Sequence, residues 1–74
     1  MIATKLSDTQ YVVKNGDAVV AYINYHITVR GRGWKVNPWS ASHRPSRTLS
    51  ETAHDSARKY FGTGKVEFIL EGGK

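Results

Sequence analysis

The chain has 74 residues, enough for one small domain with a core of about a dozen apolar side chains. It contains no cysteine, which excludes disulfide bonds and thiolate metal sites. Eleven Lys and Arg residues against six Asp and Glu give a formal net charge of +5, an excess that favours anionic partners. The N-terminus lacks the apolar segment of a signal peptide and no run is long enough to span a membrane, so we expect a cytoplasmic protein with no membrane partner.

The first predicted element is a β-hairpin centred on Asn15-Gly16. Both residues tolerate the positive φ that a type I′ turn requires at its two central positions. β-forming residues flank the pair, at 11–13 before it and at 18–20 after it. The preceding residues 1–8 are expected to form an N-terminal tail.

A long second strand is predicted over residues 18–30, with a bend or bulge near Asn24 because strands of this length are rare. Alternation with a period of two separates its faces. The predicted buried face carries Ala21, Ile23, Tyr25, Ile27 and Val29, and the opposite face carries Val20, Tyr22, Asn24, His26, Thr28 and Arg30.

A tight turn over residues 30–33 and a short third strand over 34–36 follow, and Asn37-Pro38 ends this strand. Residues 38–47 are polar, contain two prolines and have no period, which predicts a long loop.

A helix is predicted after this loop. Thr48 and Glu51 have the spacing of a capping box, with Thr48 as the N-cap. An apolar stripe at helical spacing follows, and Gly62 and Gly64 end the helix. The last predicted strand spans residues 65–71.

These elements predict an α+β fold of order β-β-β-α-β. We expect an antiparallel sheet of three to four strands with one helix packed on one face. A single domain would cover residues 9–71, and residues 72–74 would form a C-terminal tail. The other face of the sheet would meet solvent or a partner.

The clearest functional signal is segregated charge. Residues 18–50 include no Asp or Glu, whereas they include several cations that would create a local positive potential. Guanidinium groups suit bidentate contact with phosphates or carboxylates. The candidate binding cations are Arg30, Arg32, Lys35, Arg44 and Arg47.

Aromatic and further basic residues complete the candidate surface. Trp39 and Tyr22 could stack on bases or anchor a partner, although Trp39 could equally cap the edge of the core. Trp34 is better explained as core. His26 lies on the outward face of the long strand, and His54 and Arg58 on the predicted helix would join the basic surface.

No pattern of catalytic or cofactor-binding residues stands out. The three histidines have no Cys or carboxylate at metal-ligand spacing, so we expect no metal site. Ser40, Ser42 and His43 are adjacent loop residues that lack an orienting third group. Nucleotide-binding motifs are absent from the sequence. We expect no enzymatic activity, no cofactor and no small-molecule substrate.

Residues 48–69 resemble a pattern seen in small phage-encoded proteins, including some anti-CRISPR proteins and inhibitors of host RNA polymerase. The matching residues are Thr48-Leu49-Ser50-Glu51, Ala53, Ala57, Tyr60 and the segment 64–69. The resemblance implies a non-catalytic protein that occupies a surface of a larger machine, in a bacterial cell or an infected host cell. It assigns no site residue.

Three functional hypotheses follow. The first is a basic binding module that docks on nucleic acid or a nucleoprotein machine through its Arg and Lys residues. The second is a phage-type inhibitor that contacts an acidic surface of a host nucleoprotein complex. The third is a structural or assembly protein, in which open sheet edges pair with another copy. The sequence fixes neither the oligomeric state nor the choice between DNA, RNA and protein.

Overall fold

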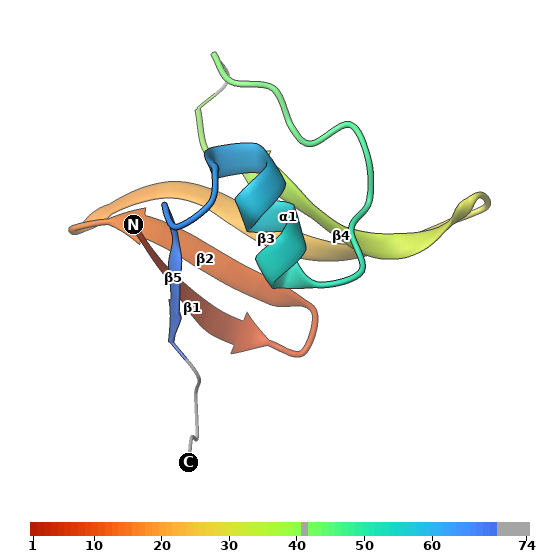
Figure 1. Ribbon diagram of the computed structural model, residues 1–74, viewed down its shortest axis with the longest axis horizontal. Helices are drawn as coiled ribbons and strands as arrows, with labels where there is room; N and C mark the ends of the chain where they lie inside the picture. The colour runs from red at the N-terminus through yellow and green to blue at the C-terminus, as the bar shows by residue number, and fades with distance from the viewer. Residues whose placement is uncertain (41, 70–74) are drawn as a thin grey trace.

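The computed structural model describes residues 1–40 and 42–69. In these residues a five-stranded sheet, of order β4-β3-β2-β1-β5, carries one helix on one face (Figure 1). The α+β class and the single helix on a sheet are therefore confirmed, with one strand more than expected. The elements are β1 (Ile2–Ser7), β2 (Gln10–Asn15), β3 (Ala18–Thr28), β4 (Gly31–Pro38), α1 (Ala53–Phe61) and β5 (Glu67–Ile69).

The additional strand is β1, in the segment that we expected to be a tail. Ala3 is fully buried opposite Val13 of β2, so β1 contributes to the core. β1 also pairs with β5 in parallel, and the Glu67 N–H donates to the carbonyl oxygen of Met1 (2.9 Å). The sheet is therefore mixed rather than antiparallel, because the chain returns to β1 after crossing the sheet through α1. The predicted tail at 72–74 lies outside the described residues.

The first hairpin forms where predicted but with a different turn. Asn15 pairs with Ala18, so Gly16 and Asp17 are the two central residues. Gly16 has a φ of 65°, and among the described residues only glycines have positive φ. This excludes type I′, and glycine at the first central position is the preference of type II′ turns.

The irregularity in β3 lies at Val20 and not at Asn24. Val13 pairs with Ala21 and Lys14 with Val19, which leaves Val20 without a partner on β2. The extra residue of such a bulge shifts the alternation of side chains. Val20 therefore packs against the core instead of facing outward as predicted.

The far end of the β3–β4 hairpin extends beyond α1 (Figure 1). Ile27 and Val29, predicted to be buried, are exposed there because no other element of the described chain reaches them. β4 is longer than predicted and begins at Gly31, so the turn consists of Val29 and Arg30.

The segment before the helix runs along the outer edge of β4. Ser50 and Trp34 exchange two backbone hydrogen bonds (2.7 and 2.8 Å), and the Ser46 N–H donates to the carbonyl oxygen of Val36 (2.9 Å). Ser50 therefore forms a β-bridge with Trp34, and residues 48–51 do not form a first helical turn. The helix begins one turn later, where the Thr52 hydroxyl accepts the Asp55 N–H (3.0 Å), so the assignment of Thr48 as N-cap was wrong.

The core lies between α1 and the sheet. Ile23, Val13 and Val36 are its largest fully buried apolar side chains, and Ala53 and Ala57 allow α1 to approach them closely. Trp34 packs against this core and contacts Tyr11 and Tyr25 edge-on, with ring centroids 5.7 and 5.4 Å apart. The preference for Trp34 as a core residue is thus confirmed.

Candidate functional site

The candidate site lies on the face of the sheet opposite α1, here called the open face. Ala3, Val13 and Ala21 point into the core, so their strand neighbours, apart from Val20 at the bulge, point the other way. Within the described chain, α1 packs against the core side of the sheet and not against the open face. The register aligns one row of open-face residues across all five strands: Asn37, Tyr22, Val12, Thr4 and Ile69.

An aromatic pair marks the β3–β4 side of the open face. The rings of Tyr22 and Trp39 lie 6.4 Å apart between centroids with an interplanar angle of 55°. Trp39 is 68% exposed, which decides the question that the sequence left open, because a cap on the core would be covered. The Trp39 N–H donates to the carbonyl oxygen of Val20 (2.9 Å), which ties its backbone to β3.

A cluster of cations lies at the outer corner of the same face. It surrounds an open space of about 370 Å³, here called the cationic hollow. Among the described residues none that lines it is acidic. The lining residues are His26, Thr28, Arg30, Lys35, Arg47, Thr48 and Leu49.

Backbone geometry explains why these separate segments meet. Gly33 lies beneath the loop, and a Cβ there would stand 2.6 Å from the carbonyl oxygen of Ser50 and 2.9 Å from Cβ of Leu49. Only glycine therefore lets the segment around Leu49 close over β4. In the hairpin turn, the Thr28 hydroxyl donates to the carbonyl oxygen of Gly31 (2.8 Å) and accepts the Arg30 N–H (3.2 Å). These contacts fix the loop and the turn from which Arg47 and Arg30 project.

The hollow and the aromatic pair are linked by two side chains. Asn37 stands opposite Tyr22 in the sheet, and its Nδ2 lies 3.5 Å from Nε2 of His26 in the hollow. A ligand that extends along β3 would thus meet aromatic rings, then amide and imidazole groups, then cations.

Other predicted binding residues lie elsewhere. Arg32 and Lys35 are three positions apart on β4, so their side chains point to opposite faces of the sheet. Arg32 shares the face of Trp34 and Val36 and points away from the open face. Arg44 lies on the α1 side, where its carbonyl oxygen accepts the Tyr60 hydroxyl (2.6 Å). The five cations expected on one surface are therefore divided, and Arg30, Lys35 and Arg47 are the three that the structure brings together.

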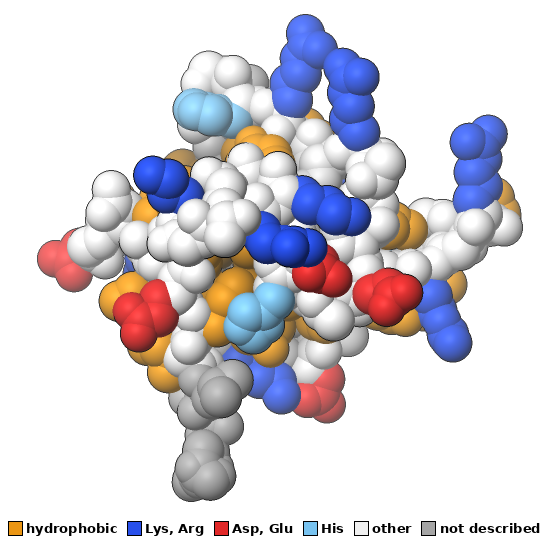
Figure 2. Space-filling model, in the orientation of Figure 1, with side chains coloured by type: hydrophobic (Ala, Val, Ile, Leu, Met, Phe, Trp, Pro, Cys, Tyr) orange, Lys and Arg blue, Asp and Glu red, His pale blue; other side chains and the backbone are white. Residues whose placement is uncertain are grey.

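His54 and Arg58 are also separated from the hollow. They line a different space of about 280 Å³ beside Gly62, Gly64 and Val66. His54 stacks on Phe68 with ring centroids 3.9 Å apart, and Arg58 pairs with Asp55 at 3.1 Å. On the face that carries α1, Lys and Arg side chains are spread over the surface, some of them next to each other, with acidic side chains among them (Figure 2).

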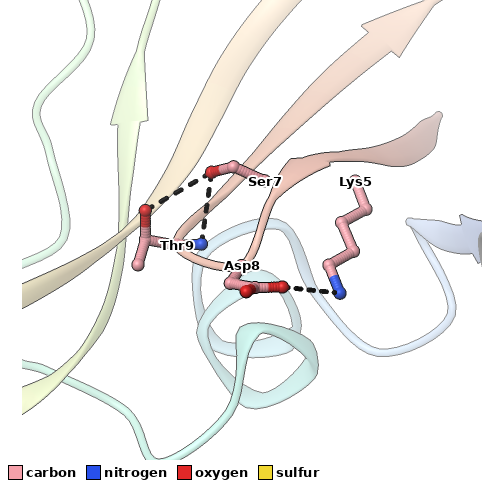
Figure 3. A network of polar contacts seen from close by, with 4 residues as sticks. All are labelled: Lys5, Ser7, Asp8 and Thr9. Carbon is pink, nitrogen blue, oxygen red and sulfur yellow. Dashed lines mark hydrogen bonds and ion pairs between the residues drawn. The ribbon is translucent and has the colours of Figure 1, made fainter.

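Carboxylates neutralise some cations but not those of the hollow. Lys5 pairs with Asp8 at 3.3 Å in the β1–β2 turn, where the Ser7 hydroxyl accepts the Thr9 N–H (3.2 Å; Figure 3). Within residues 1–40 and 42–69, Arg30, Lys35 and Arg47 form no such ion pair. Their positive potential is thus available to a ligand.

Sequence reasoning missed several residues of the site. Asn37 was treated as a strand terminator, and Leu49 was included only in the segment predicted to begin the helix. Thr28 was placed on the outward face by alternation, and that pattern was the available signal. Loop residues such as Thr48 carry no periodic signal, so only tertiary contacts could place them.

The loop residues Ser40, Ser42 and His43 lie close together but remain at the surface. The Ser42 hydroxyl lies 3.3 Å from Nδ1 of His43, and 2.8 Å from the Ser40 hydroxyl. All three residues are exposed. In the described part of the chain, no three His, Cys, Asp or Glu side chains gather as metal ligands would.

No protein-family model, curated protein or solved structure matches this chain. Among residues 1–40 and 42–69, no helix has both the length and the apolar character to cross a membrane.

Proposed function

We propose that this protein binds single-stranded nucleic acid across the open face. The observation that carries the proposal is the cationic hollow, whose cations form no ion pair among the described residues. It lies on the same face as the pair formed by half-buried Tyr22 and exposed Trp39. Phosphates would occupy the hollow, and bases would stack on Trp39 and Tyr22. This role would place the protein in the cytoplasm of a bacterial or infected host cell.

The residue types suit the two parts of a nucleotide. The guanidinium groups of Arg30 and Arg47 can donate two parallel hydrogen bonds to one phosphate, and Lys35 adds a point charge. Stacking of a base on an aromatic side chain contributes about 1–3 kcal/mol. A single strand is favoured over a duplex, because the bases of a duplex are already stacked on each other.

A salt series tests the proposal. Fluorescence anisotropy would compare labelled single-stranded DNA and RNA with duplexes of the same sequence. Three phosphate contacts predict a slope of about −2 in a plot of log K against log salt for a single strand. Binding should also quench Trp39 fluorescence. Equal or tighter binding of duplexes, or no binding of any strand at low salt, would refute the proposal.

A protein partner is the second candidate, favoured by apolar side chains at the β1–β5 end of the open face. Ile2 is 43% exposed and Ile69 is 46% exposed. Such a contact would suit an inhibitor of RNA polymerase or of a CRISPR effector. Ile69→Asp would then abolish retention on the purified, nuclease-treated complex, whereas Lys35→Gln would weaken it less. Loss of retention after nuclease treatment would exclude this candidate.

A further inference from the structure

A third pocket lies on the α1 side of the loop that forms the hollow. It has a volume of about 260 Å³ and lies between residues 45–50 and the helix. Hydroxyl groups and cations line it, so it is called the hydroxyl pocket. Its principal side chains are Arg47, Thr48, Ser50, Ser56, Lys59 and Tyr60.

Ser56 is the most informative of these residues. It is 2% exposed, and its Oγ is the one buried side-chain polar atom without a hydrogen-bond partner among the described residues. A buried hydroxyl without a partner costs free energy, which a bound acceptor would recover. Its presence on a helix otherwise buried through Ala53 and Ala57 is explained if a ligand completes the site.

The charged side chains around this hydroxyl indicate that the ligand is negatively charged. Arg47 approaches from the loop and Lys59 from α1, and neither forms an ion pair within the described chain. The acidic residue of the first helical turn, Asp55, pairs with Arg58 and lines a different pocket. An anion would therefore be attracted from two sides.

The walls of the pocket are held by contacts that do not use the Ser56 hydroxyl or the charged groups of Arg47 and Lys59. The Tyr60 hydroxyl donates to the carbonyl oxygen of Arg44 (2.6 Å) and braces the loop against α1. The Ser46 hydroxyl accepts the Val36 N–H (2.9 Å) and anchors the same segment to β4. Since the loop is fixed before a ligand arrives, less ordering would be lost on binding.

We propose that the hydroxyl pocket binds a phosphate group. Donors from two opposing elements suit a tetrahedral anion with oxygens on several sides, whereas a planar carboxylate would use fewer of them. The phosphate could be free inorganic phosphate or the terminal phosphate of a nucleic-acid strand. Arg47 also lines the cationic hollow, so a terminal phosphate here would enter beside the proposed binding face.

The test is a titration of the whole protein with inorganic phosphate, followed by the amide signals of Ser56 and Lys59 in NMR. We expect saturable binding with a Kd on the order of 1 mM and a rise in the midpoint of thermal unfolding. Ser56→Ala and Lys59→Gln should each weaken binding about tenfold. Arg44→Gln is the matched control, because its side chain lies on the same loop outside the pocket lining, and it should bind as the native protein does.

Three results would overturn this inference: no saturation by phosphate, an equal response to acetate at the same ionic strength, or unchanged binding in both pocket variants. Tighter binding of a 5′-phosphorylated than of a 5′-hydroxyl oligonucleotide would identify a strand end as the source, and equal binding would identify free phosphate. If phosphate binds but no strand does, the proposed function fails and this inference stands. If strands bind but phosphate does not, only this inference fails.

Discussion

Trp34 and Trp39 are five positions apart in the sequence but lie in opposite surroundings. Trp34 is held edge-on by Tyr11 and Tyr25 against the core, whereas Trp39 is largely exposed beside Tyr22. Arg32 and Lys35 show the same division among cations. Side-chain direction along β4 and at the residue that follows it, rather than residue type, therefore decides which aromatic or basic residue is available to a ligand.

The largest expected effect comes from exchanging the two tryptophans for alanine. Trp34→Ala should destabilise the fold by about 3 kcal/mol, because it removes a large side chain packed against the core. In so small a domain this is most of the stability expected. Trp39→Ala should change stability by less than about 0.5 kcal/mol. Urea unfolding followed by circular dichroism measures both, and similar losses would contradict the division between the faces.

The next effect concerns the contact between Gly33 and the loop. Gly33→Ala should cost about 2 kcal/mol, because its Cβ would collide with the backbone of Ser50, which cannot rotate away as a side chain could. The displaced loop would carry Arg47 away from the hollow, so strand binding should weaken as well. Unfolding and anisotropy titrations measure the two losses, and native values in both would show that Gly33 does not seat the loop.

A smaller effect distinguishes the observed start of α1 from the predicted one. Thr52→Ala should cost about 1 kcal/mol, because it removes the acceptor of the Asp55 N–H. Thr48→Ala should have an effect below about 0.5 kcal/mol, since Thr48 caps no helix in the described structure. A larger loss of stability for Thr48→Ala than for Thr52→Ala in thermal unfolding would support the capping box predicted from the sequence.

The smallest effect compares the two cations of β4. Lys35→Gln should make the salt slope for single-strand binding shallower by about 0.7, the contribution of one phosphate contact. Arg32→Gln should leave the slope unchanged, because Arg32 lies on the other face. Equal changes in the two slopes would mean that attraction by net charge, and not the hollow, drives binding.

Local patterns predicted much of this fold because they depend on neighbouring residues. The glycine hairpin, the alternation of Ala21 and Ile23, and the helix ending at Gly62 follow from backbone conformation and periodicity. The failures required distant contacts. β1 pairs with the neighbouring β2 and also with β5, which comes from the other end of the chain. Ser50 is extended because Trp34 pairs with it, which overrides the local helix signal.

The candidate site, like the fold, was predicted from the sequence only in part. The sequence alone identified an acid-free segment rich in cations, and alternation placed Tyr22 and His26 on the outward face. Only the tertiary structure selected Arg30, Lys35 and Arg47 from the larger set of cations, and exposed Trp39 beside Tyr22. It also placed Ser56 and Lys59 opposite the loop, where no sequence pattern had suggested a site.

The charge composition, the alternation of the strands and the presence of one amphipathic helix could be predicted from the sequence, because each depends on residues close to one another along the chain. Which cations meet, and which hydroxyl is buried without a partner, depend on contacts between distant segments. Those outcomes depend on where an aperiodic loop closes over β4, and that closure depends on the space at Gly33 and the hydrogen bonds of Ser46 and Ser50.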